Sequence, residues 1–230
     1  MEPSPLQSFN VKIPLEPGAR IDLARVLEVF HGWISNPADG ELLIDVADYR
    51  HVPAGPGVLL VGFEGDYSVD HAGNRPGLRY NRKAPLPGAD EDRLLQALRA
   101  AGRGCLRLEK ELAEPPSALA GDRGPEPLES GSSSRPVSDA PAREHATRFS
   151  RASFEFFCND RALAPNDQGT REKVEPWLRA LLRRLAGNRE YHLRFEPDPR
   201  RRFGGVVEIT GPVDLIQVAG SLPVGPDSES

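Results

Sequence analysis

One order of strands and helices occurs twice along the chain, and this repetition limits the fold more than any single motif. In the first third an alternating strand, a helix and two apolar runs are predicted at Phe9–Leu15, Asp22–Asn36, Leu42–Tyr49 and Val58–Glu64. In the last third the same order is predicted at Phe154–Cys158, Thr170–Leu185, Tyr191–Glu196 and Val206–Thr210. Phe9 and Leu43 are 34 residues apart, and Phe154 and Tyr191 are 37 apart. The pattern therefore predicts an α+β fold of two similar βαββ units, with helices packed on an antiparallel or mixed sheet.

The segments outside the two units predict the domain organisation. The first unit, residues 1–112, is extended by a hairpin and by a helix that starts at Asp90. Residues 113–148 are rich in Pro, Ser and Gly and poor in large apolar side chains, so we expect a disordered linker. The second unit spans residues 149–218, and residues 219–230 form a flexible tail. The spacing leaves open whether the two units share one sheet or pack as a pseudo-dimer.

Hydrophobic patterns predict which faces of these elements are buried. Alternation in the first strand separates Phe9, Val11 and Ile13 from the polar positions between them, and Pro14 favours a sheet edge or a strand end. In the first helix one apolar stripe follows Asp22, which is the expected N-cap. The runs that begin at Leu42 and Val58 are almost continuously apolar, as in strands covered on both faces.

Composition excludes several classes of protein. The 230 residues carry a net charge of −5, which argues against a general affinity for nucleic acid. The two cysteines, Cys105 and Cys158, fall in a predicted helix and a predicted strand, so both are expected to be buried thiols, with no disulfide or zinc site. The first residues resemble no secretory signal, and the longest apolar run, Val58–Phe63, is too short to cross a bilayer. We expect a soluble protein of the cytoplasm, not associated with a membrane.

An acidic block near the end of the third predicted element contains the candidate catalytic residues. Asp45, Asp48 and His51 recur at every third position, and carboxylates beside an imidazole can act as an acid–base pair or bind a divalent cation. Asp45 interrupts an apolar strand, where a carboxylate needs a partner, and Arg79 or Arg82 is the structural alternative. The spacing matches no known metal motif, so no metal site is predicted.

A basic run follows the acidic block and contains the candidate ligand-binding residues. Arg79, Tyr80, Arg82 and Lys83 combine cationic side chains with an aromatic ring, which suits a phosphate or a carboxylate. Pairing of these cations with the acids upstream, across the hairpin, is the alternative.

A second basic region, Arg171–Arg202, is the basis of a second alternative, an RNA-associated protein. A solvated helix face and turn explain the same residues, and no RNA-binding motif accompanies them, so binding to nucleic acid is not expected.

These observations favour a non-catalytic protein that binds a protein partner or a small anionic ligand. No nucleophile, phosphate-binding or dinucleotide motif is present, and no cofactor is predicted. An enzyme with its site in the block Asp45–Lys83 and an RNA-associated protein are the competing hypotheses. A homo-oligomer is compatible with the sequence.

Overall fold

The computed structural model describes residues 6–38, 40–52, 55–71, 73, 75–114 and 146–223. It confirms the α+β class, because eight strands form one antiparallel sheet with four helices. The first part of the chain contains β1 (Phe9–Pro14), α1 (Leu23–Ser35), β2 (Leu43–Tyr49), β3 (Gly57–Gly62), β4 (Gly65–Asp70), β5 (Gly77–Arg82) and α2 (Asp90–Ala113). The second part contains β6 (Ser153–Cys158), α3 (Gln168–Ala186), β7 (Tyr191–Phe195), β8 (Gly204–Ile209) and α4 (Leu215–Ser221).

The sheet joins the two parts of the chain at its centre. Its strand order is β2-β3-β4-β5-β1-β6-β8-β7, and every neighbouring pair is antiparallel. In the central pair Val11 lies opposite Phe156 and Lys12 lies opposite Glu155. With the hairpin β4–β5 left out, the order β2-β3-β1 matches the order β7-β8-β6, and the strand directions match as well.

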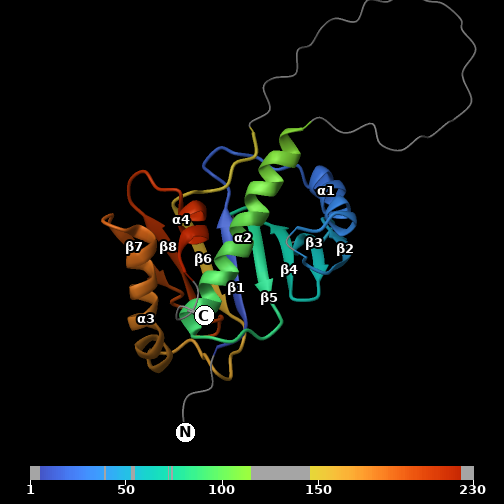
Figure 1. Ribbon diagram of the computed structural model, residues 1–230. Helices are drawn as coiled ribbons and strands as arrows, with labels where there is room; N and C mark the ends of the chain where they lie inside the picture. Colours follow the sequence, from blue (N-terminus) through green and yellow to red (C-terminus); the bar gives the residue numbers. More distant parts are fainter. Residues whose placement is uncertain are drawn as a thin grey trace, which may run out of the picture.

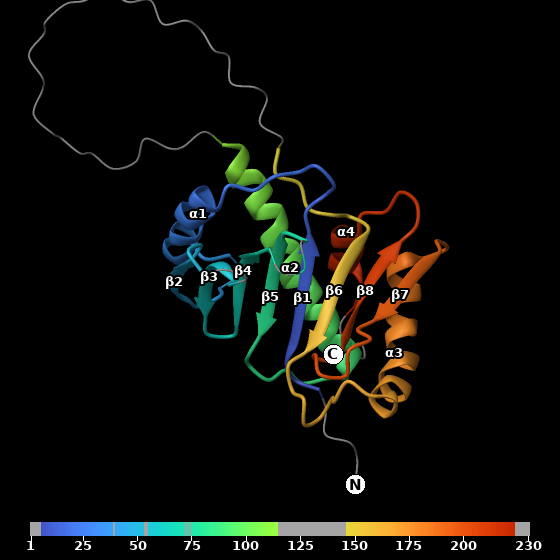
Figure 2. The ribbon, with the colours of Figure 1, turned by 180° about the vertical axis from the view of Figure 1, so that it is seen from behind.

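The four helices cover one face of the sheet, and none of the described residues forms a helix on the other face (Figure 1, Figure 2). The alternation predicted for β1 is confirmed: Phe9, Val11 and Ile13 are at most 1% exposed and belong to the apolar core. Because successive strand residues point to opposite faces, Asn10 and Lys12 lie on the face without helices. We call this second surface the open face.

Local signals in the sequence account for several element boundaries. Asp22 caps α1 as predicted, because its Oδ1 accepts a hydrogen bond of 2.8 Å from the backbone N of Ala24. Pro14 lies at the end of β1, one of the two predicted places. An analogous cap, Asp167, starts α3, where its carboxylate accepts a bond from the backbone N of Thr170.

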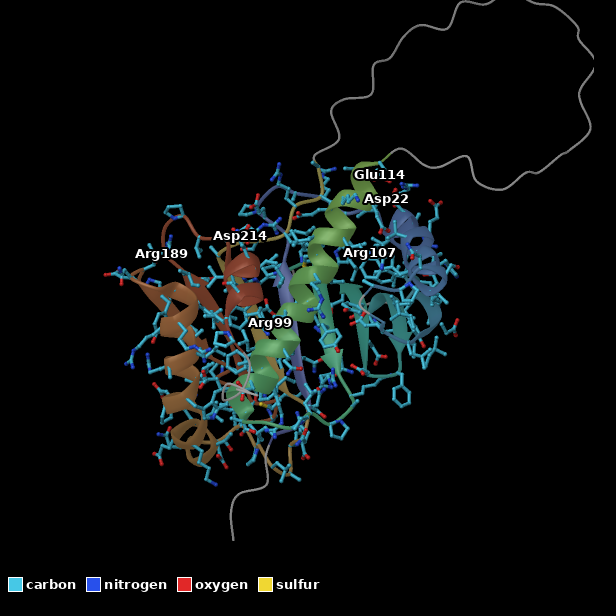
Figure 3. All side chains as sticks on the ribbon, in the orientation of Figure 1. Asp22, Arg99, Arg107, Glu114, Arg189 and Asp214 are labelled. Carbon is cyan, nitrogen blue, oxygen red and sulfur yellow. The ribbon has the colours of Figure 1, made fainter. Side chains whose placement is uncertain are left out.

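Helix α2 crosses the middle of the sheet and contacts every other helix. Its Arg107 donates to the backbone O of Asn36 and lies over the ring of Trp33, which ties α2 to α1 (Figure 3). Toward the other side, Arg99 donates a 2.7 Å bond to the backbone O of Ala219 in α4 (Figure 3). A single helix thus connects the layer from one end to the other.

Two predictions about the apolar runs and the C-terminal segment are wrong. The strand β2 is an edge strand rather than one covered on both faces, and Leu42 and Ile44 are 60% and 55% exposed. A register shift between Leu43 and Asp45 turns Ile44 away from the core while Leu43 stays buried. The predicted tail overlaps α4, whose Ala219 is fully buried.

The predicted linker, residues 113–148, overlaps ordered structure at both of its ends. Ala113 ends α2, and residues 146–148 pack against the loop after β1. There Thr147 donates its hydroxyl to the backbone O of Arg20, and the backbone O of Arg148 accepts from Glu16. The rest of the predicted linker, and the predicted tail beyond residue 223, lie outside the described residues. Within the part of the chain that is described, no helix is long and apolar enough to span a membrane.

Glycines in α2 allow the helix to lie close to its neighbours. A Cβ at Gly104 would come within 2.8 Å of Leu78 and 3.0 Å of Tyr67, and one at Gly102 within 2.7 Å of Ile216. By propensity alone these residues would weaken the helix, since Gly is about 1 kcal/mol less favourable than Ala in a helix. The structure shows that they fit the helix to the sheet and to α4.

We expect Gly104→Ala to destabilise the protein by about 1–3 kcal/mol, although alanine is the better helix former, because the added methyl overpacks the core. Gly32→Ala is the matched control: Gly32 is an exposed position of α1 with nothing near its missing Cβ. This change should stabilise by up to about 1 kcal/mol. Urea unfolding followed by circular dichroism measures both, and equal stabilisation by the two changes would contradict the packing argument.

Both cysteines are buried thiols, as predicted. Burial raises the pKa of Cys158 to about 12 and that of Cys105 well above its ordinary value. Since the thiolate is the reactive form, neither side chain is poised as a nucleophile.

A thiol reagent such as 5,5′-dithiobis(2-nitrobenzoate) should leave both cysteines of the native protein unmodified at pH 8 and react with both in denaturant. The unfolded chain ionises its thiols near pH 8.5, whereas folded Cys158 holds its proton to about pH 12. Stability should therefore fall as the pH rises through this interval, because the unfolded state then binds fewer protons. Fast labelling in native buffer would contradict the burial of the thiols.

Candidate functional site

Polar side chains from three neighbouring strands occupy the centre of the open face. In β1, Asn10 and Lys12 lie opposite Asn81 and Arg79 of β5. In turn, Arg79 of β5 lies opposite Ser68 of β4. The open face of Figure 2 is therefore polar at its centre, while the opposite sides of the same strands hold the apolar core.

A buried ion pair lies at the middle of this surface. The Nζ of Lys12 is 2.6 Å from Oδ1 of Asp70, and the two side chains are 0% and 1% exposed. Asp70 also contacts Arg79, whose Nη2 is 2.8 Å from Oδ2. The Arg79 side chain is 27% exposed, so one cation of the cluster is sealed and the other reaches the surface. Buried charges require such partners because their removal from water is costly.

A row of amides runs beside the ion pair. Asn10 donates its side-chain N–H to Oδ1 of Asn159, and Asn159 donates to Oδ1 of Asn81 over 2.6 Å. Asn81 then donates to Oδ2 of Asp66 over 3.4 Å. Asp66 is held at the end of the row by the backbone N of Gly62 and by Lys83, whose Nζ is 2.6 Å from Oδ1. Segments far apart in the sequence thus meet in one hydrogen-bonded line.

Two adjoining cavities lie over these polar groups, and both are bordered by Asn10, Arg79 and Arg202. The smaller, of about 180 Å³, is also lined by Phe157, Glu196 and Arg201. The larger, of about 400 Å³, is also lined by Pro56, Leu59, Asp66, Ser68, Asn81 and Asn159. We call the two cavities together the central groove.

The turn between β7 and β8 brings arginines to the groove. Its backbone is braced by Asn166, whose amide donates to the backbone O of Glu196 and of Asp198. Arg201 is engaged within the turn: its Nη1 is 3.5 Å from Oε2 of Glu196. For Arg202, no ion-pair partner lies among the described residues.

Cationic donors toward the groove are therefore only partly satisfied. The buried Nε of Arg79 has no hydrogen-bond acceptor within the described part of the chain. Arg202 is exposed and borders both cavities. Of the acids in the lining, Asp66 is already neutralised by Lys83, and Glu196 faces Arg201.

The three candidate catalytic residues do not meet in this groove. Asp45 is exposed on the edge strand β2, and its Oδ1 accepts from the backbone N of Val46. The expectation that Asp45 is buried and paired with Arg79 or Arg82 is therefore wrong. Asp48 pairs with Arg50 at 2.7 Å, and the hydrogen bonds from Arg50 lower the pKa of Asp48 to about 2. His51 is exposed just beyond the strand.

Of the four candidate ligand-binding residues, the structure brings only Arg79 to the groove. Tyr80 points into the core beside Tyr67, with ring centroids 5.0 Å apart, and burial raises its pKa. Arg82 pairs with Glu64 at 3.1 Å, and Lys83 pairs with Asp66. The alternative that the basic run neutralises the preceding acids is thus confirmed for these residues.

The basic region Arg171–Arg202 does not form one surface. Arg179 pairs with Glu175 on α3, and Arg184 of the same helix pairs with Glu91 of α2. These side chains belong to the helical layer, whereas Arg201 and Arg202 line the groove of the open face. A continuous track for RNA is not present among them.

Sequence reasoning missed Asn10, Asn159, Phe157 and Arg202 as groove residues. The alternation in β1 did signal a polar face at Asn10, but nothing local shows that Asn159 lies beside it. Among the described residues, no group of three or more His, Cys, Asp or Glu side chains is placed to hold a metal ion.

The fold and the groove together define an α+β protein with a polar cavity system on an uncovered sheet face. A comparison of the chain with protein-family models, curated proteins and solved structures found no match in any of the three.

We expect Asp70→Asn to destabilise the protein by about 3–5 kcal/mol, because it leaves the buried Lys12 ammonium without its carboxylate. The matched control is Asp48→Asn, which removes a paired but exposed carboxylate and should leave the urea midpoint unchanged. Equal midpoints for the two variants would show that the Lys12–Asp70 pair contributes little to the fold.

Proposed function

We propose that the protein is a non-catalytic binding protein whose central groove holds a small anionic ligand. The observation that carries the proposal is that Arg79 and Arg202 border both cavities of this groove. Guanidinium groups bind phosphates and carboxylates through paired N–H donors, and they do so best when already held in place.

The surroundings of the two arginines support a binding role rather than simple ion pairing. Asp70 fixes Arg79 through Nη2, so little side-chain entropy remains to be lost when a ligand binds. The Nε of Arg79 still lacks an acceptor, and Arg202 lacks an ion-pair partner among the described residues. An anion in the groove would accept from the exposed N–H groups of both guanidiniums.

We further propose that the two βαββ segments are a structural repeat and that the groove lies at their junction. The matched order and directions of β2-β3-β1 and β7-β8-β6 support this view. Both segments contribute to the groove: Asn10 comes from the first, and Asn159 and Arg202 come from the second, while Arg79 lies on the hairpin β4–β5 that extends the first. A site between two related halves needs both of them to be folded.

Arg202→Gln tests the binding proposal. This side chain has no carboxylate partner within the described part of the chain, so its change should leave the melting temperature within a few degrees. Isothermal titration calorimetry at low salt, with inorganic phosphate, pyrophosphate and citrate as probes, should show binding to the unmodified chain. The affinity for the bound probe should fall about tenfold or more in the variant, and for both proteins it should weaken as salt is added.

The matched control is Arg200→Gln in the same turn. Arg200 is 89% exposed, pairs with Asp198 and lines neither cavity, so its variant should bind as the unmodified chain does. Equal losses in the two variants would indicate nonspecific charge attraction. No measurable binding of any probe to the unmodified chain would refute an anion site in the groove.

A further inference from the structure

The lining of the larger cavity contains both charged side chains and neutral polar side chains, and we call the neutral ones the polar wall. Arg79 and Arg202 border it, and Ser68, Asn81 and Asn159 line it. Apolar surface is contributed by Pro56 and Leu59. A volume of about 400 Å³ lies within the usual range of small-molecule sites, roughly 300–1,000 Å³.

The amide row has a fixed direction. Asp66 can only accept when ionised, so the amide of Asn81 must donate to it, and Asn159 must then donate to Asn81. Each of these two amides uses one N–H and one carbonyl lone pair within the row. One N–H donor and one lone pair remain on each of them.

Such a wall matches hydroxyl groups, since a hydroxyl both donates and accepts. The Ser68 hydroxyl, 6% exposed and on the neighbouring strand, adds a third group of the same kind. A bare inorganic anion would use the arginines and leave this wall in contact with water alone.

We infer that the ligand is a polyhydroxylated anion of the sugar phosphate class. This inference rests on the proposed anion site: the phosphate binds at Arg79 and Arg202, and the sugar hydroxyls bind along Asn159, Asn81 and Ser68. The apolar surface of Leu59 contacts the carbon skeleton of the sugar, as the mixed lining of the cavity requires.

Calorimetry with glucose 6-phosphate, ribose 5-phosphate, inorganic phosphate and free glucose separates the two parts of the site. At least one of the two sugar phosphates should bind tenfold or more tightly than inorganic phosphate, and glucose should bind weakly or not at all. Asn159→Ala should reduce the affinity for the sugar phosphate about tenfold and change the affinity for phosphate less than twofold.

Ser68→Ala removes a single hydroxyl and guards against misfolding of the Asn159 variant. It should lower the preference for sugar phosphate over phosphate by a factor of about three to ten. Gln168→Ala is the matched amide control, because Gln168 is exposed on α3 and lines neither cavity. Its preference should equal that of the unmodified chain.

The outcomes distinguish the inference from the function on which it rests. If phosphate binds as tightly as the sugar phosphates and neither variant alters the ratio, the anion site stands and the sugar class is wrong. Adenosine monophosphate carries an adenine ring in addition to ribose and phosphate. If it binds more tightly than both sugar phosphates and Phe157→Leu abolishes the difference, the adenine ring rather than the sugar hydroxyls determines recognition, and the inference is wrong. If none of these anions binds, the proposed function itself fails.

Discussion

The ion pair between Lys12 and Asp70 lies at the centre of the open face, which no helix of the described residues covers. An uncovered face is normally wet, yet these two side chains are sealed from solvent by their neighbours. Their charges are satisfied there, and Asp70 extends the arrangement to Arg79, the cation that borders the groove. The ion pair that stabilises buried charge on the open face therefore belongs to the same cluster that positions Arg79, the guanidinium group bordering both cavities.

The apolar core on the other face depends on close contacts of α2 with the sheet and with its neighbouring helices. Gly102 and Gly104 let α2 approach the sheet and α4, and Arg99 and Arg107 then tie it to the helices on either side. The strands that carry this core on one face carry the polar groups of the open face on the other, so a shift of the strands under α2 would also move those polar groups. The packing of the core and the geometry of the central groove are thus coupled through the same strands.

Elements specified by short-range signals could be predicted from the sequence. The cap at Asp22 and the alternation in β1 involve residues a few positions apart, and both are confirmed. Features set by tertiary contacts could not: β2 has the composition of a covered strand but lies at the sheet edge. In the candidate site, the basic run of the sequence pointed to Arg79. Its ion-pair partner is Asp70, whereas the sequence pointed to Asp45. The strand register decides which carboxylate of the acidic block faces Arg79, and this register cannot be read from the sequence alone.

The pairing of β1 with β6 has a consequence for how the molecule is assembled. These adjacent strands are separated along the chain by all the residues between Pro14 and Ser153, which include α1, the strands β2 to β5, and α2. Bringing the two strands together therefore has a high cost in loop-closure entropy. In the finished sheet this pairing joins the five strands β2-β3-β4-β5-β1 to the three strands β6-β8-β7. The same pairing places Asn159 and Arg202 beside Asn10 and Arg79 around the central groove. Anything that binds the groove across the two parts of the chain would therefore stabilise the pairing that spans the longest stretch of sequence.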